Sequence, residues 1–157
     1  MKARIFKTTA AVTLLLGWAL APAFAQEREW NFDTGDDDAY LVFGVPETDD
    51  VGVSFWCTIG MGEIRIFLPD AGENVQAGQV IKLEIDVAGR SFSFDATTSS
   101  NEEAGTTSAE AAAVASDPVF QALLTADRFT IRAGKEESVF PLQGADFDNL
   151  LRVCGHQ

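Results

Sequence analysis

The segment QVIKLEIDVAGRSFSFD, residues 79–95, decides the fold class of this 157-residue chain. Its first half alternates apolar and charged side chains with a period of two, which is typical of a β-strand with one buried face. A turn at residues 88–89 leads into a second alternating run, so the segment predicts a hairpin. The alternation assigns two core and two surface positions. These are Ile85 and Phe94 in the core, and Glu84 and Ser93 at the surface.

The same period of two predicts strands elsewhere in the chain. Residues 39–45 and 51–58 form a second hairpin, in which residues 46–50 are an acidic tip that begins with a proline. In the second of these strands Cys57 shares the core face, whereas Trp56 points to the other side. Further strands are expected near Trp30 and Phe32 and at 63–68, 129–131 and 139–142.

Two short helices are also expected. Asp117 is a natural N-cap and Pro118 a natural first helical residue, and an apolar stripe at helical spacing follows, so residues 117–126 predict a helix. Residues 146–153 predict a second helix. The alanine-rich segment 108–115 has helical propensity, but the helix start that follows it favours an edge strand, and both interpretations stay open.

The first 25 residues have the composition of a secretory signal peptide. Three basic residues precede an apolar run over 8–20 and a small-residue cleavage site, AFA, at 23–25. The apolar run is shorter than the roughly 20 residues that span a bilayer. The first cysteine is Cys57, so neither membrane insertion nor a lipid-modified N-terminus is expected. The sequence predicts a periplasmic or secreted protein that is cleaved after Ala25.

The predicted mature protein, residues 26–157, is strongly acidic. Cleavage removes Lys2, Arg4 and Lys7, which leaves eight of the eleven basic residues against 24 acidic ones and a formal net charge of −16. A field of this sign repels phosphate backbones and anionic lipid head groups, so nucleic acid and membrane surfaces are not expected as partners. A basic protein or a divalent cation remains possible as a partner. The alternative interpretation is that the acidity only keeps the domain soluble.

The two cysteines, Cys57 and Cys154, predict one disulfide, because exported proteins fold in an oxidising compartment. A catalytic thiol would need a CxxC motif or a histidine base, and the sole histidine, His156, lies at the chain end. Strands, helices and cysteines together predict an all-β single domain over residues 26–157. We expect an antiparallel sandwich or partly open barrel with two short helices and one disulfide.

The sequence contains no recognisable catalytic motif. Serine hydrolases need a histidine base, zinc sites need several His or Cys ligands, and nucleotide sites need a glycine-rich loop before a helix. Gly60-Met61-Gly62 lies between two predicted strands and indicates a turn. A pair of catalytic carboxylates stays open as an alternative, because 24 acidic residues offer many pairs. We expect no enzyme activity, no cofactor and no metal.

Two features are candidate sites. The loop DTGDDD places Asp33, Asp36, Asp37 and Asp38 near a glycine and could supply oxygen ligands to Ca²⁺. It lacks the spacing and terminal glutamate of an EF-hand, so a solvated turn is the favoured interpretation. The second feature is an acidic tip beside exposed aromatic side chains, which suits a basic protein because aromatics anchor and charge steers. Its residues are Glu47, Asp49, Asp50, Trp56 and Tyr40. For Trp56, a ring that a helix or a loop covers is the favoured interpretation.

The segment YLVFGVPETDD at 40–50, followed by a strand ending in Cys57, by DPVFQALLTADRFTI at 117–131 and by Cys154, resembles a group of small uncharacterised exported bacterial proteins. This resemblance covers nearly all of the mature chain and implies no known activity or functional residue. Residues 120–154 are also distantly similar to exported proteins of the invasion-associated locus B type, which share a strand, a hairpin and a closing cysteine. Members of that type usually carry further cysteines, whereas this chain has two.

The function predicted from these observations is a non-enzymatic periplasmic binding or inhibitory module for a basic protein or an envelope component. One alternative is a structural or stress-related envelope protein without a discrete ligand. The other is a carboxylate-based hydrolase.

Export generates a direct prediction. Protein purified from the exported fraction should have the mass of residues Gln26–Gln157 less two hydrogens for the disulfide, as measured by intact mass spectrometry. A mass that includes residues 1–25 would contradict the cleavage site.

Overall fold

The computed structural model describes residues 27–102 and 104–155. The predicted signal peptide, its cleavage site and His156 lie outside these residues. The described chain is mostly strand, with two short helices. Its elements are β1 (Glu29–Thr34), β2 (Asp38–Gly44), β3 (Val51–Thr58), β4 (Glu63–Leu68), β5 (Val80–Val87), β6 (Arg90–Asn101), β7 (Thr106–Val114), α1 (Pro118–Leu123), β8 (Arg128–Ala133), β9 (Glu136–Pro141) and α2 (Phe147–Cys154).

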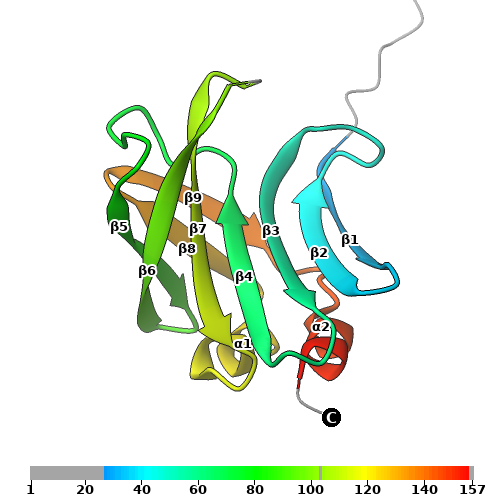
Figure 1. Cartoon of the computed structure of the whole chain (residues 1–157). Helices are drawn as coiled ribbons and strands as arrows, with labels where there is room; N and C mark the ends of the chain where they lie inside the picture. Colours follow the sequence, from blue (N-terminus) through cyan, green and yellow to red (C-terminus); the bar gives the residue numbers. More distant parts are fainter. Residues whose placement is uncertain (1–26, 103, 156–157) are drawn as a thin grey trace, which may run out of the picture.

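The strands belong to one antiparallel sheet in the order β1-β2-β3-β4-β7-β6-β5-β8-β9. Consecutive strands pair along most of it, but β7 returns to β4 and β8 pairs with β5. The sheet curls on itself, so that β8 and β9 pass behind β4 and β7 in Figure 1. The result is a half-barrel with β1 and β9 as its edge strands, which confirms the predicted all-β fold class.

The concave face of the half-barrel holds the core. Leu41, Phe55 and Ile66 lie opposite one another on β2, β3 and β4, and the row continues through Ala111 of β7 to Ala96 of β6. Each of these side chains is at most 3% exposed. Because successive residues of a strand point to opposite faces, their sequence neighbours lie on the convex face.

Aromatic rings join the two walls of the half-barrel. The ring of Phe55 on β3 lies 6.0 Å from that of Phe129 on β8 and 4.9 Å from that of Phe147 on α2, measured between centroids. The Nε1 of Trp30 on β1 donates a 2.6 Å hydrogen bond to the carbonyl of Pro141 at the end of β9. This bond ties the two sheet edges together at one point and satisfies an indole N–H that burial removes from water.

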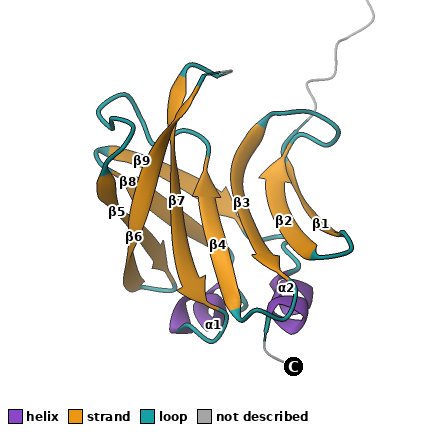
Figure 2. Cartoon of the chain, in the orientation of Figure 1, coloured by secondary structure: helices purple, strands orange, loops and turns teal. Residues whose placement is uncertain are grey.

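The two helices cover one end of the half-barrel (Figure 2). Both begin at the predicted aspartates, whose carboxylates accept hydrogen bonds from backbone amides. Asp117 accepts from the N–H of Val119 at 2.9 Å, and Asp146 accepts from that of Asn149 at 3.1 Å. Such caps satisfy amides that have no partner inside the helix.

The predicted disulfide is confirmed. It joins Cys57 on β3 to Cys154 at the end of α2, with Cα atoms 5.8 Å apart and both residues at most 1% exposed. The turn after β3 holds the same helix end, because Gly60 N donates to the carbonyl of Val153 and Gly62 N to that of Cys154, at 2.9 and 2.8 Å. These bonds satisfy carbonyls left unpaired at the helix C-terminus.

The alanine-rich segment is a strand, and the expectation of an edge strand there was wrong. β7 lies inside the sheet, between β4 and β6. Its alternate residues Ala109, Ala111 and Ala113 are buried. Hydrogen bonding to neighbours on both sides overrides the helical propensity of alanine, which is only a weak preference.

The first predicted hairpin is formed by β5 and β6 in the expected register. Ile85 is fully buried and Ser93 is exposed, as predicted. Phe94 is only half-buried, which differs from the prediction, whereas Glu84 lies outside the core as expected and is half-buried. β7 pairs with β6 only from Ala96 onward, so Phe94 has no neighbouring strand on that side.

The disulfide should contribute strongly to stability. Cys57→Ala should lower the free energy of unfolding by about 2 to 5 kcal/mol, the usual range for a native disulfide in a small exported domain. Cys154→Ala should cost about as much, because either change opens the same loop. Urea denaturation measures both. A protein as stable with either alanine as without it would contradict this role.

The register of the β5–β6 hairpin is tested by a buried and an exposed position. Ile85→Ala should destabilise the domain by about 2 to 5 kcal/mol, because it leaves a cavity in the core. Ser93→Ala is the control and should change stability by less than about 0.5 kcal/mol. Similar losses in thermal or urea unfolding would mean that the faces are assigned wrongly.

Candidate functional site

The predicted aromatic residues lie on the convex face of the half-barrel. Tyr40 of β2 is opposite Trp56 of β3, and Trp56 is opposite Arg65 of β4. The two rings stack with centroids 6.2 Å apart, and the Arg65 guanidinium carbon lies 5.4 Å from the centroid of the Trp56 ring. Trp56 is therefore half-buried between two neighbours from its own sheet, whereas Tyr40 stays 40% exposed.

Ion pairs hold Arg65 in place over the indole. Its Nη1 donates a 2.8 Å hydrogen bond to Glu110 of β7, and its Nη2 lies 3.5 Å from Glu63. The hydrogen bond to Glu110 and the charges of both carboxylates raise the pKa of Arg65, against the lowering effect of burial. The guanidinium therefore stays charged and remains available for the cation–π contact with the ring.

The acidic tip between β2 and β3 is a hydrogen-bonded turn. Thr48 Oγ1 donates to the carbonyl of Val45 at 2.8 Å and accepts from the N–H of Asp50 at 3.1 Å. Asp50 also accepts a 3.0 Å hydrogen bond from Nε of Arg28, so its charge is paired. Glu47 adopts a positive φ of 61°, a conformation that is uncommon for residues other than glycine.

A groove of about 320 Å³ lies between this tip and Tyr40. We name it the Tyr40 groove. Apolar side chains form most of its lining. Two carboxylates belong to it, and none of its lining residues within 27–102 and 104–155 is basic. The lining residues are Asn31, Asp33, Tyr40, Val42, Gly44, Val45, Pro46, Glu47, Thr48 and Val51.

The structure brings together only part of the predicted site. Tyr40 and Glu47 share the Tyr40 groove, but Asp49 and Asp50 are not among its lining residues. Trp56 lines a separate hollow of about 330 Å³ with Arg65 and the exposed Met61.

Asp33 is a lining residue that the sequence analysis did not assign to this site. It lies directly opposite Tyr40 in the β1–β2 register, as Asn31 lies opposite Val42. The alternation along β1 places Asp33 on the face opposite to Trp30 and Phe32, and that signal was present in the sequence. The cross-strand partner of Asp33 could not be predicted, because the alternation of apolar and polar residues does not determine which residues of β1 and β2 lie opposite each other.

The DTGDDD loop forms a turn between β1 and β2. Asp33 accepts a hydrogen bond from the N–H of Thr34 at 2.8 Å, and Asp38 accepts from the hydroxyl of Thr58 at 3.0 Å. Asp36 and Asp37 are exposed. Among the described residues, no three His, Cys, Asp or Glu side chains are grouped so that they could hold a metal ion.

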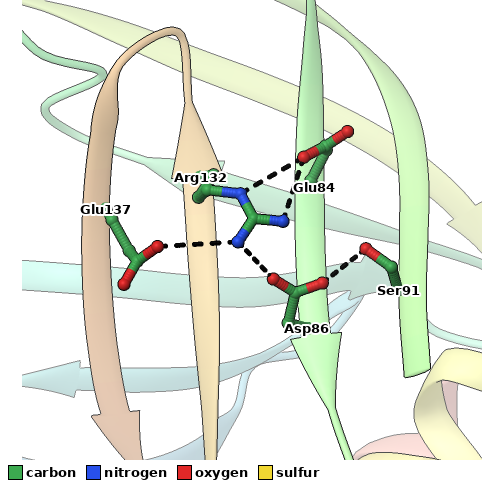
Figure 3. A network of polar contacts seen from close by, with 5 residues as sticks. All are labelled: Glu84, Asp86, Ser91, Arg132 and Glu137. Atoms are coloured by element: carbon green, nitrogen blue, oxygen red, sulfur yellow. Dashed lines mark hydrogen bonds and ion pairs between the residues drawn. The ribbon is translucent and has the colours of Figure 1, made fainter. Parts of the chain in front are cut away.

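A second charged network lies on the convex face, where β5, β8 and β9 meet (Figure 3). Arg132 is surrounded by Glu84 at 3.2 Å, Asp86 at 2.5 Å and Glu137 at 3.5 Å, and Asp86 also accepts a hydrogen bond from the hydroxyl of Ser91. The hydrogen bond with Glu84, followed by the charge of Asp86, raises the pKa of Arg132. One cation among three carboxylates ties the strands together and leaves this surface negative.

The polar side chains buried in the described part of the chain are those of Ser54, Thr98 and Ser108. The described carboxylates are instead exposed or half-buried.

Neither α1 nor α2, the helices of the described residues, has the length and apolar character of a membrane span. Comparison of the chain with known protein families, with curated proteins and with solved structures finds no match. The resemblance to small exported bacterial proteins therefore stays a prediction.

Proposed function

We propose that this domain is a non-enzymatic binding module of the periplasm or the secreted fraction, and that it binds a basic protein through the Tyr40 groove. The observation that carries the proposal is the lining of the groove, which combines an apolar floor with Asp33 and Glu47 and contains no basic residue. Within the described residues neither carboxylate takes part in an ion pair.

The chemistry of the groove suits a lysine or arginine side chain. Long basic side chains bury their methylene stem against apolar surface while the charged head keeps polar contacts. Tyr40 and Val42 offer such a surface, and the exposed ring of Tyr40 can also attract a cation. Asp33 and Glu47 would then pair with the charged head.

The charge of the whole domain supports the same class of partner. A formal net charge of −16 on the mature chain raises the encounter rate with a cationic protein and slows it with an anionic one. The disulfide suits an oxidising, exported environment.

This proposal predicts which step of binding each residue controls. A basic protein captured from an envelope extract should associate several-fold more slowly when ionic strength rises from about 0.01 to 0.15 M, because the screening length falls from about 30 to 8 Å. Asp33→Asn with Glu47→Gln should slow association at low salt.

Tyr40→Ala should chiefly speed dissociation, by roughly tenfold, because an aromatic anchor contributes contact rather than steering. Surface plasmon resonance measures both rates.

Asp36→Asn with Asp37→Asn is the matched control, because it removes the same charge from exposed positions outside the groove. It should retain most of the wild-type association rate. If it slows association as much as the groove variant does, the groove is not the site. If no protein is retained at low salt, the alternative of an envelope protein without a discrete ligand gains support.

A further inference from the structure

A cavity larger than the Tyr40 groove lies at a different place, beside the free edge of β9. It has a volume of about 550 Å³ and lies where β3 begins and β4 ends. We name it the β9-edge groove. Its lining residues are Arg28, Phe43, Val51, Gly52, Leu68, Asp70, Gly72, Glu73, Glu136, Ser138, Val139 and Phe140.

The groove runs along the side of β9 rather than over one of its faces. Ser138, Val139 and Phe140 are consecutive, and all three line it. Since successive side chains of a strand point to opposite faces, a cavity over one face would meet only every second residue. Because three consecutive residues of β9 line the cavity, it lies beside the strand, next to its backbone.

The hairpin register shows which backbone groups of β9 point away from β8, and of these residues Val139 lines the groove. A two-residue turn joins Ala133 to Glu136, so these two form the hydrogen-bonded pair that closes the β8–β9 hairpin. The alternation of an antiparallel ladder then directs the N–H and C=O of Glu137 and Val139 away from β8. The carbonyl of Pro141 follows the same alternation, and it accepts the hydrogen bond of the Trp30 indole.

The charge around the groove is negative. Asp70, Glu73 and Glu136 line it, and its one basic lining residue, Arg28, is paired with Asp50. The apolar part of the lining includes Phe43, Leu68 and Phe140. Gly52 leaves this floor open, because a Cβ there would lie 3.2 Å from the Phe140 ring and 3.3 Å from the Phe43 ring.

We propose that the β9-edge groove binds an extended, basic peptide segment, which adds to the sheet as a strand alongside β9. The outward peptide groups of Glu137 and Val139 supply the hydrogen bonds, as in other cases of strand addition. Apolar side chains of the segment enter the groove over Phe43 and Phe140, and the negative charge of Asp70, Glu73 and Glu136 attracts the basic side chains. The Trp30–Pro141 bond sets the limit of pairing at one end.

A second copy of this chain is a poorer occupant of the same edge. β9 begins with two glutamates and ends with a proline, which are devices that discourage edge-to-edge pairing. Two copies would also each bring a strongly acidic surface to the contact. The exposed edge of β9 between the two glutamates and the proline therefore suits a positively charged strand.

The test uses a blocked hexapeptide of alternating lysine and valine, titrated by calorimetry into the mature protein at low salt. The protein carries Asp33→Asn and Glu47→Gln, so that the Tyr40 groove does not contribute. The peptide should bind, and a glutamate–valine peptide should not. A lysine–valine peptide with N-methylated alternate amides should bind at least about tenfold more weakly, because it lacks the backbone donors of a ladder.

Two variants of one residue separate backbone from side chain. Val139→Pro removes the outward N–H of β9 without removing a bond to β8, and should weaken binding about tenfold or more. Val139→Ala keeps that N–H, so its affinity for the peptide should stay within about threefold of that of the protein with Val139. Thermal unfolding checks that both variants fold. Should Val139→Pro unfold the protein, the N-methylated peptide decides alone.

Three results would overturn the proposal. The lysine–valine peptide fails to bind, or it binds as tightly after N-methylation, which would mean that the groove takes a cation or an apolar molecule without a ladder. The third is dimerisation through β9, seen as concentration-dependent sedimentation that Val139→Pro abolishes. Protection of the Val139 amide from hydrogen exchange when the peptide is bound would support the proposed strand addition.

Discussion

The contact of Phe55 with Phe129 and Phe147 is the interaction on which the rest of the structure depends. A single sheet with one apolar face has no second layer to cover that face. It must therefore curl until its own strands meet, or leave the face in water. Phe55 lies near one end of the strand order and Phe129 near the other, so their contact brings the two walls together. The helix that carries Phe147 then covers the end of the space they enclose.

Curling sets the chemistry of the convex surface. Rows of facing residues that run across the strands become stripes on the outside, and each stripe has its own character. Tyr40, Trp56 and Arg65 form an aromatic and cationic stripe, whereas Glu84, Arg132 and Glu137 form a charged one. Curling without closing also leaves one edge strand, β9, beside a cavity. The β9-edge groove thus follows from one architectural fact, a half-barrel that stops short of closure.

Local signals in the sequence predicted the elements well but not their neighbours. Alternation around Ile85 and the cap at Asp117 each depend on a few adjacent residues, and both were confirmed. The pairing of β4 with β7 was not predicted, because a period of two says which face a residue occupies and not which strand lies beside it. The same limit applies to the site. Tyr40 was identified as a surface aromatic, but its neighbour Asp33 on β1 depends on register.

The position of the disulfide divides the sheet into two parts with different constraints. Cys57 and Cys154 are separated by 97 positions, and the covalent loop between them contains β4 to β9 and nearly all of α2. β1, β2 and most of β3 lie before it, held only by hydrogen bonds and packing. Local opening should therefore begin in β1 and β2, which of these strands lie farthest along the chain from the cross-link, since a cross-link limits the freedom of the chain within its loop. Asp33, Tyr40 and Glu47 all belong to this outer part, so the shape of the Tyr40 groove can adjust to an occupant while the cross-linked remainder stays folded.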